Sequence, residues 1–507
     1  MADRTRRDAG NSNDNMSELT ETALRSGLAR VGAQAISFAL RIGSIMVFAR
    51  LLSPKDFGFV GMVTAITGLL SLLRDFGLSA ATVQRAHVTE EQLSSLFWFN
   101  LLFGGILGLG VVALAPLVTH FYNEPRLFWV TVALAPALVF NGAGVQHSAI
   151  LQRQMRFATL SAIDVGALAV STGIGIAMAA AGLRYWALVA TTVCLPFVST
   201  AWLWIAVRWI PNRPKMAVGI RPMIGFGGTM SLLHIIAYAT SNLDKVLVGR
   251  FWGAHALGLY GRAYQLINVP TLLLTSAVAE VAFALLARVQ HDRGQVKNYF
   301  LKSYSLVLAM TIPITICAGE LAPDLVSVLL GPQWQQVGPI LRLLAPTILA
   351  FALIEPIAWL MLSQGMLGRS FRVYTAFAPA VIVGYLIGLP FGPKGVALGY
   401  SIAIALSIVP RIAWGVHGTG ISLRDVGRAA SGPLISGAIA ALAGFGLPLL
   451  PGASLSPFLR LLIDGTILLG IYAVVLLYVL GQKEFYLGLL RTIFKRPNSA
   501  PAAQDPA

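Results

Sequence analysis

Charged residues are scarce in this 507-residue chain. They make up 11% of the sequence, whereas hydrophobic residues reach 56% and the mean hydropathy is +0.74. A soluble domain carries about 25% charged residues, so a soluble fold is excluded. One membrane helix needs roughly 20 apolar residues, which gives the chain room for about 14 spans joined by short loops. No loop is long enough to fold as a separate domain.

Catalytic and metal-binding motifs are missing as well. The sequence contains neither a P-loop nor an HExxH pair, and carboxylates outside the apolar stretches are sparse. Its two cysteines, Cys194 and Cys317, both fall in apolar stretches, which is typical of small core residues and not of a disulfide or metal pair. We therefore predict that the chain is not an enzyme and has no catalytic residue, metal or cofactor.

The net charge of +16 would be compatible with nucleic-acid binding, but the distribution of the basic residues along the chain indicates a membrane topology instead. Lys and Arg concentrate in alternate segments between the apolar stretches, as the positive-inside rule requires of cytoplasmic loops. This pattern predicts an even number of spans with both termini in the cytoplasm. Topology thus accounts for the charge, and no nucleic-acid partner is expected. Examples on the predicted inner side are Arg153, Arg156, Arg213, Arg221 and Lys297.

A weak internal repeat occurs 200 residues apart in the chain. Residues 36–61 read ISFALRIGSIMVFARLLSPKDFGFVG, and residues 236–261 read IAYATSNLDKVLVGRFWGAHALGLYG. An offset of six spans gives both copies the same orientation, which is a parallel repeat of the kind that secondary transporters use. The sequence therefore predicts an all-α polytopic membrane protein with about 14 transmembrane helices. The identical pairs are Ile36 and Ile236, Ala39 and Ala239, Arg50 and Arg250, Gly58 and Gly258, and Gly61 and Gly261.

The predicted organisation consists of two six-helix bundles in parallel repeat, followed by two further helices. After them, residues 482–496 alternate apolar and basic side chains, which predicts an amphipathic helix on the anionic inner leaflet, the alternative being a frayed basic tail. The predicted boundaries are a cytoplasmic N-terminal tail at 1–24, the first bundle at 25–207, a basic linker at 208–221, the second bundle at 222–415, helices 13 and 14 at 416–480, and the amphipathic segment and tail at 481–507.

Polar side chains form stripes on four of the predicted spans. In span 1 (25–50), Gln34, Ser37 and Arg41 lie on one helical face, because helix positions separated by three or four residues share a face. Spans 2 (58–82), 7 (222–249) and 8 (257–287) carry similar stripes in corresponding repeat positions. The candidate cavity residues are Gln34, Arg41, Arg74, His234, Lys245 and Arg262, and the candidate coupling-ion residues are Asp75, Asp244 and Glu280.

These charges are too costly to face lipid. One charge at mid-bilayer costs about 2.5–3.5 kcal/mol on insertion scales. Two interpretations remain open: the charges line a central hydrophilic cavity, or pairs such as Arg74 with Asp75 join helices inside the protein. Asp164, Arg342, Glu355 and Asp464 stand alone in the sequence and are interpreted as packing or interfacial groups.

Four motifs occur in a characteristic order. They are ARLLSPKDFGFVGM (49–62), SNLDKVLVGRFWGAHALGLYGRAYQL (241–266), VAFALLARVQHD (281–292) and LLGPQWQQVGPILRLLA (329–345). With these motifs the chain resembles the polysaccharide transporter (oligosaccharide flippase) family of the multidrug/oligosaccharidyl-lipid/polysaccharide superfamily. The resemblance covers nearly the whole chain.

The resemblance implies a flippase in the bacterial inner membrane that works by alternating access. Its implied substrate is a polyprenyl-diphosphate-linked oligosaccharide repeat unit, moved from the cytoplasmic to the periplasmic leaflet for exopolysaccharide or lipopolysaccharide biosynthesis. Membrane lipids, a polysaccharide polymerase and export machinery are the implied partners. Helices 13 and 14 would then form a groove for the polyprenyl tail, as in the similar lipid II flippases. Flippases of this kind often have 12 spans, so helices 13 and 14 depart from the usual pattern.

Two other functions compete with this one. A cation-coupled multidrug exporter of the same superfamily would favour a cavity of carboxylates and aromatic side chains, whereas the stripes here contain about as many bases as acids. A membrane polymerase or ligase would usually carry a large periplasmic loop, and the longest outside segment here, about 320–337, is mostly apolar.

Overall fold

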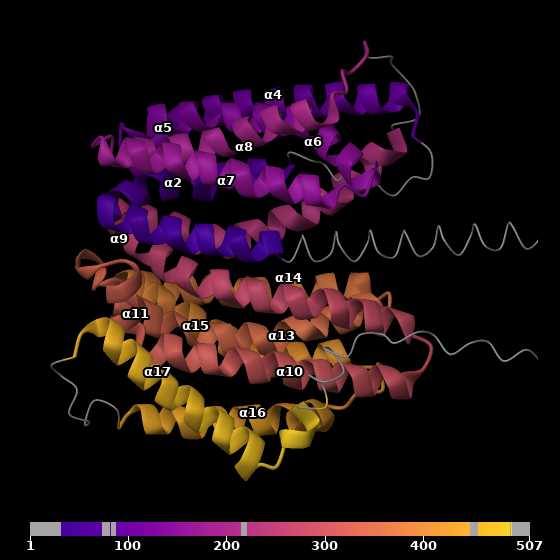
Figure 1. Cartoon of the computed structure of the whole chain (residues 1–507), viewed down its shortest axis with the longest axis vertical. Helices are drawn as coiled ribbons and strands as arrows, with labels where there is room; N and C mark the ends of the chain where they lie inside the picture. The colour runs from indigo at the N-terminus through magenta and orange to yellow at the C-terminus, as the bar shows by residue number, and fades with distance from the viewer. Residues whose placement is uncertain are drawn as a thin grey trace, which may run out of the picture. The chain divides into compact units, whose positions relative to one another are not determined.

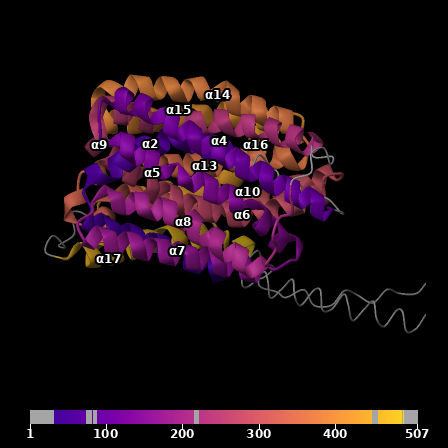
Figure 2. The same ribbon diagram turned by 90° about the horizontal axis from the view of Figure 1, so that it is seen from above.

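The computed structural model describes residues 32–73, 82, 88–213, 221–446, 455–486 and 488. For 71–73, 221–237 and scattered positions between 269 and 284, the description covers the backbone alone. These residues form helices joined by short connections, and the described ranges contain no strand (Figure 1). Neighbouring long helices run roughly side by side in both views (Figures 1 and 2). The predicted all-helical class is confirmed.

The helices before residue 289 are long and mostly apolar. They are Gly32–Leu51, α2 (Pro54–Leu73), α4 (Glu90–Tyr122), α5 (Leu127–Leu134), α6 (Pro136–Arg153), α7 (Phe157–Ala180), α8 (Tyr185–Val207) and α9 (Arg221–Arg288).

The later helices include several shorter pieces. They are α10 (Arg293–Glu320), α11 (Ala322–Leu329), the 3-10 turn Pro332–Trp334, α12 (Val337–Leu344), α13 (Pro346–Ser363), α14 (Leu367–Gly388), the 3-10 turn Leu389–Phe391, α15 (Gly392–Val416), α16 (Leu423–Gly444), α17 (Pro457–Val474) and a π-helical turn at Val475–Val479.

Each predicted span overlaps a described helix, while residues 25–31, 74–81 and 447–449 of these spans lie outside the description. The long helix α9 contains two of them, because its backbone breaks at Gly253 (φ 78°, ψ 179°), a conformation that favours glycine. The continuous stretch Leu367–Val416 likewise contains α14 and α15. Within the described ranges, 10 stretches have the length and mean hydropathy of a membrane span. The chain is therefore a multi-pass membrane protein, and the count of 14 spans stays a prediction.

The internal contacts divide the chain into two compact units. The first unit is Met1–Gly261 with Leu329–Gln333, and the second is Arg262–Val328 with Trp334–Ala507. The division falls inside α9, so this helix contributes to both units. The predicted domain boundaries, with a linker at 208–221, stay a prediction.

Side-chain caps fix the beginnings of several helices. Thr89 and Gln92 form a capping box at α4, and Ser422 with Asp425 forms another at α16. Asp292 caps α10 by accepting hydrogen bonds from the backbone N–H groups of the first turn. The bond from the Gln295 backbone is the largest cause that holds the pKa of Asp292 below its usual value.

An interruption of the helix occurs at a similar place in each half of the chain. A Leu-Ala-Pro sequence separates α5 from α6 at Pro136 and α12 from α13 at Pro346. Both α6 and α13 then end shortly before a residue with positive φ, Met155 (54°) and Gly365 (72°). Pro has no N–H to donate and is favoured in the first turn of a helix, so the new helix starts at the same point in both halves. This common geometry supports the predicted duplication.

The paired glycines of the repeat lie at one close helix crossing. A Cβ on Gly58 would lie 1.7 Å from the carbonyl oxygen of Ala254, and a Cβ on Gly258 would lie 1.8 Å from that of Pro54. Pro54 and Ala254 are themselves 200 residues apart, so the two contacts are equivalent under the repeat. Only glycine allows backbones to approach this closely. The repeat therefore preserves the two glycines for a steric reason.

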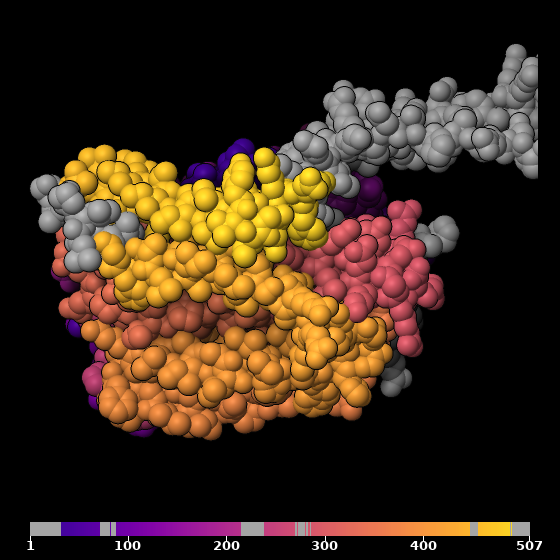
Figure 3. Space-filling model, turned by 90° about the horizontal axis from the view of Figure 1, so that it is seen from below, coloured from indigo at the N-terminus to yellow at the C-terminus, as the bar shows by residue number. Residues whose placement is uncertain are grey.

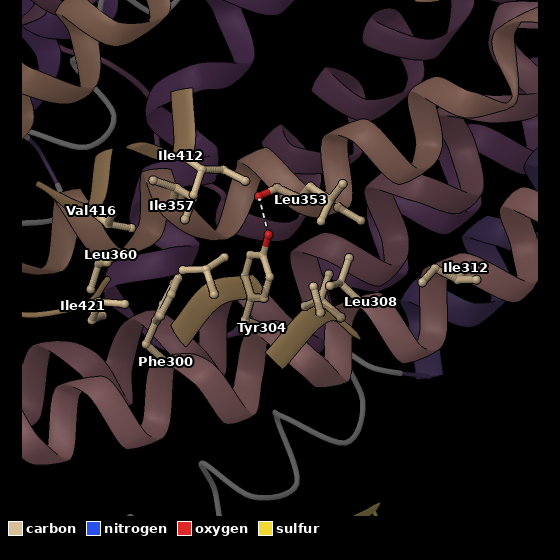
Figure 4. Packing of buried hydrophobic residues seen from close by; sticks show 14 of the residues in the cluster. Phe300, Tyr304, Leu308, Ile312, Leu353, Ile357, Leu360, Ile412, Val416 and Ile421 are labelled. Carbon is tan, nitrogen blue, oxygen red and sulfur yellow. Dashed lines mark hydrogen bonds between the residues drawn. The ribbon is translucent and has the colours of Figure 1, made fainter. Parts of the chain in front are cut away.

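A large apolar core holds the second unit together. It contains buried side chains of α10, α13, α15 and α16, among them Phe300, Leu308 and Ile357 (Figure 4). Tyr304 is buried in this core and donates a hydrogen bond of 3.1 Å from its Oη to the carbonyl oxygen of Leu353. The bond satisfies a polar group that would otherwise be costly inside the core.

Candidate functional site

A polar cavity of about 880 Å³ lies within the first unit. Its walls come from the helix Gly32–Leu51 and from α2, α4, α5, α6, α7 and α8, with Tyr238 from α9. Amide, hydroxyl and charged groups all face it. The polar lining residues are Gln34, Ser37, Arg41, Thr64, Thr67, Asn141, Ser148, Gln152, Asp164, Thr192, Ser199, Thr200 and Tyr238.

Two predicted site residues, Gln34 and Arg41, line this cavity together. Both side chains are exposed. The polar stripe predicted for span 1 therefore faces a cavity rather than a packed interface at these two positions. Their binding roles stay predictions.

Hydroxyl groups in the cavity are oriented by backbone carbonyls of neighbouring helices. Tyr238 donates from Oη to the carbonyl oxygen of Thr64 at 3.0 Å, which joins α9 to α2. Thr200 donates from Oγ1 to the carbonyl oxygen of Phe140 at 2.7 Å, which joins α8 to α6. Each bond fixes the direction of a polar group in the cavity wall. An oriented wall of hydroxyls and amides is suited to binding sugar hydroxyls.

Lys245 follows Tyr238 along the same helix. Its Nζ donates to Oδ1 of Asn242 at 2.7 Å, and Asn242 in turn donates to the carbonyl oxygen of Tyr238 at 3.0 Å. Lys245 is partly buried and is not part of the cavity lining. The structure thus links Lys245 to the cavity wall through these side chains but does not place it in the cavity.

Asp244 is buried and bonded within α9. Its side chain has no exposed area, and its Oδ2 accepts a hydrogen bond of 2.7 Å from Oη of Tyr260, which is also buried. The bond crosses the break at Gly253 and joins the two arms of the helix. The other carboxylate oxygen, Oδ1, has no hydrogen-bond partner among the described residues. A coupling-ion role for Asp244 stays a prediction.

The other predicted residues lie elsewhere or outside the description. Arg262 belongs to the second unit, where its Nη1 donates to Oε1 of Gln265. Arg74 and Asp75 lie outside the described residues. The backbones of His234 and Glu280 are helical, but their side chains are outside the description.

Several lining residues were not singled out from the sequence. Asn141, Ser148 and Gln152 on α6 are separated by seven and four residues and share one helical face, which is the signal in the sequence that could have marked them. Asp164 was interpreted as a packing or interfacial group, yet it shares the cavity with Arg41. These positions are more than 90 residues from Arg41 in the chain, and only the tertiary fold brings them into one wall.

The remaining isolated charges have local partners. Arg342 donates from Nε to the carbonyl oxygen of Gly319 at 2.9 Å, which caps the end of α10 as a packing group would. Glu355 interacts electrostatically with Arg411, and that guanidinium lies 5.2 Å from the centre of the Phe377 ring. Asp464 lies in a second cavity, described below.

Solved structures share this fold. A structure titled lipid II flippase MurJ, in an inward closed conformation, matches 92% of this chain and 100% of its own with a TM-score of 0.72 at 15% identity. An inward-facing multidrug resistance transporter of the MATE family and MOP superfamily matches 77% of this chain and 98% of its own, with a TM-score of 0.61 at 14% identity. At these identities the likeness concerns the fold alone.

Three of the curated relatives are bacterial proteins named for polysaccharide biosynthesis. The teichuronic acid biosynthesis protein TuaB of Bacillus subtilis (strain 168) is 29% identical over 310 residues, which is 60% of this chain and 64% of that protein. The lipopolysaccharide biosynthesis protein WzxC of Escherichia coli (strain K12) is 25% identical over 387 residues, 74% of this chain and 77% of its own. The succinoglycan biosynthesis transport protein ExoT of Rhizobium meliloti (strain 1021) is 24% identical over 309 residues, which is 61% of this chain and 63% of that protein.

The match to TuaB thus spans slightly under two thirds of that protein. A family model described as polysaccharide biosynthesis protein matches residues 47–339, which is more than half of the chain and includes both copies of the repeat glycines. Together with the motifs at the ends of the first and seventh spans, this match identifies the family. The chain belongs to the polysaccharide biosynthesis protein family.

Proposed function

We propose that this chain is a flippase that moves a polyprenyl-diphosphate-linked oligosaccharide from the cytoplasmic to the periplasmic leaflet of a bacterial inner membrane. The observation that carries the proposal is the polar cavity of the first unit, in which Arg41 is surrounded by amides and hydroxyls. The family membership supports it, as does the transport role in the name of the succinoglycan relative. In this function the chain is a transporter and not an enzyme.

The chemistry of the cavity fits the two polar parts of such a substrate. A guanidinium forms paired, charge-assisted hydrogen bonds with phosphate oxygens, so Arg41 would bind the diphosphate. Amides such as Asn141 and Gln152 both donate and accept hydrogen bonds, which suits sugar hydroxyls. The polyprenyl tail needs no polar group and would stay in the lipid. A polymerase and export machinery would use the product on the periplasmic side.

A cation-coupled multidrug exporter remains the alternative. That function would favour carboxylates and aromatic side chains, whereas the polar lining of this cavity is mainly amide and hydroxyl, with Asp164 as its carboxylate and Tyr238 as its aromatic ring. The lining therefore favours a sugar-containing anion over an organic cation.

Depletion of the protein tests the proposal directly. We expect the lipid-linked oligosaccharide to accumulate in the cytoplasmic leaflet, because its synthesis continues while its transfer stops. The measurement is mass spectrometry of extracted lipids, combined with a membrane-impermeant sugar-modifying reagent added to intact spheroplasts. Re-expression of the wild-type chain is the control. Normal levels of the intermediate, or an intermediate that the reagent reaches as before, would contradict a flippase role.

The proposed topology makes a separate prediction. Reporter fusions placed after Arg221 and after Lys297 should report the cytoplasm, because Lys and Arg surround both positions. A fusion near Gly331 should report the periplasm. For each fusion site, the activity of a reporter that works only in the cytoplasm is compared with that of a reporter that works only in the periplasm, and the more active one shows the side of the membrane. A periplasmic signal after Arg221 would mean that the first bundle is assigned wrongly.

A further inference from the structure

A second cavity, of about 1100 Å³, lies within the second unit between α10, α11, α12, α13, α16 and α17. Most of its wall is apolar, and examples are Ile312 and Ile316 of α10 and Leu349 of α13. It follows α16 from Gly444 back to Leu434, a distance of about 15 Å at the helical rise of 1.5 Å per residue. An apolar channel of this length is suited to an acyl chain.

One end of this cavity is charged. Here α10 and α16 end and α17 begins, and the lining changes from aliphatic to ionic. Arg460 Nη1 lies 3.6 Å from Oδ1 of Asp324, and Asp464 follows Arg460 by one helical turn. The guanidinium of Arg342 also reaches this end, where its Nη2 donates to the carbonyl oxygen of Glu320 at 3.3 Å. The charged lining residues are Glu320, Asp324, Arg342, Arg460 and Asp464.

The balance of charge restricts the ligand. The three carboxylates outnumber the two guanidiniums, so a polyprenyl diphosphate, with more than one negative charge, would meet net repulsion here. A headgroup with one ammonium beside one phosphate would instead match both signs. An ammonium that carries N–H groups can also donate charge-assisted hydrogen bonds to the carboxylates. This combination occurs in an aminophospholipid.

We propose that this cavity binds a phosphatidylethanolamine molecule of the bilayer and not the tail of the transported substrate. One acyl chain lies along α16, the phosphate faces the two guanidiniums, and the ammonium faces the three carboxylates. Figure 3 shows α17 in yellow lying against α16 in orange on one face of the molecule. The bound lipid would hold these two helices against α10. This differs from the tail-binding groove that the family resemblance implies for helices 13 and 14.

Native mass spectrometry of the full-length, delipidated protein tests the proposal. Three probes with identical acyl chains are added in turn: phosphatidylethanolamine, phosphatidylcholine and phosphatidylglycerol. We expect phosphatidylethanolamine to bind at least about tenfold more tightly than either of the others, because its ammonium can donate charge-assisted hydrogen bonds to the carboxylates. Phosphatidylcholine has the same charge but no N–H donor, and phosphatidylglycerol has no ammonium. Undecaprenyl diphosphate is added as a competitor and should not displace the bound phosphatidylethanolamine.

Two classes of variant locate the site. Asp324→Asn combined with Asp464→Asn should remove the preference for phosphatidylethanolamine while leaving some binding, because the apolar channel remains. Ala441→Phe should reduce binding of all three lipids, because the ring fills the channel. Asp425→Asn, at the opposite end of α16, is the matched control and should keep the preference.

Some results would overturn the proposal. Equal binding of the three phospholipids would remove the role of the ammonium. Displacement by undecaprenyl diphosphate would assign the cavity to the substrate instead. A preference that survives the double Asp→Asn change would place the lipid elsewhere. None of these outcomes would contradict the flippase proposal, which is tested by the accumulation of the lipid-linked oligosaccharide, so the two proposals fail separately.

Discussion

Replacement of Arg41 by alanine should reduce export by roughly one to two orders of magnitude while the protein stays inserted at its normal level. Arg41 is exposed to the polar cavity, so its loss would remove the proposed ligand for the diphosphate without leaving a buried carboxylate unpaired. The estimate follows from about 1.5–3 kcal/mol for a charge-assisted hydrogen bond. Export is measured as surface polysaccharide, and insertion as protein abundance in isolated membranes.

Two further variants make this result specific. Arg41→Lys should recover part of the export if charge dominates and little of it if the paired geometry of the guanidinium matters. Lys394→Ala, at an exposed position of α15, removes a positive charge away from the cavity and should have no effect. Full export by the double variant Arg41→Ala with Arg74→Ala would rule out phosphate binding. Loss of the protein itself would support a packing role for these charges.

A methyl group added at Gly58 or at Gly258 should destabilise the protein by about 1–3 kcal/mol, the usual cost of overpacking. The Cβ in Gly58→Ala would lie 1.7 Å from the carbonyl oxygen of Ala254, and the Cβ in Gly258→Ala would lie 1.8 Å from that of Pro54. Neither oxygen belongs to a flexible side chain, so the two backbones must separate. The measurement is the thermal unfolding midpoint of the purified protein in detergent.

Gly261→Ala is the matched control. A Cβ there meets no atom within 4 Å, and alanine is favoured over glycine inside a helix by about 0.5–1 kcal/mol. The double variant Gly58→Ala with Gly258→Ala should cost less than the sum of the two single changes, because one separation of the backbones relieves both clashes. If the losses of stability in the two single variants simply add, or if Gly261→Ala loses as much stability, the close crossing is not the reason that positions 58 and 258 require glycine.

The membrane fold could be predicted from the sequence because hydropathy and charge are local properties. The apolar stretches became helices, and the face that carries Gln34 and Arg41 became part of a cavity wall. The full extent of that cavity was not predicted. Asn141, Ser148 and Gln152 share one face of α6, but a stripe of uncharged polar residues does not show which neighbouring helices it faces, and only the tertiary fold joins it to Asp164 of α7 and to Arg41.

Asp244 illustrates a second limit. From the sequence it was a cavity or coupling residue, because a charge in an apolar helix is expensive. In the structure it is buried against Tyr260, 16 residues further along α9. Helical periodicity relates residues three or four apart and gives no information across a backbone break such as Gly253. The hydrogen bond between Asp244 and Tyr260 therefore could not be predicted from the sequence.

The bond between Asp244 and Tyr260 also limits the order in which the two copies of the repeat diverged. At the corresponding positions the first copy has Ser44 and Val60. An ancestor with the aspartate but without the tyrosine would have buried a carboxylate without this hydrogen bond, which costs more than a lone buried hydroxyl. Evolution from a copy that resembled the present first one would then have passed through tyrosine before aspartate. The first copy has no such constraint, because Val60 has no polar side-chain group that the residue at position 44 must satisfy.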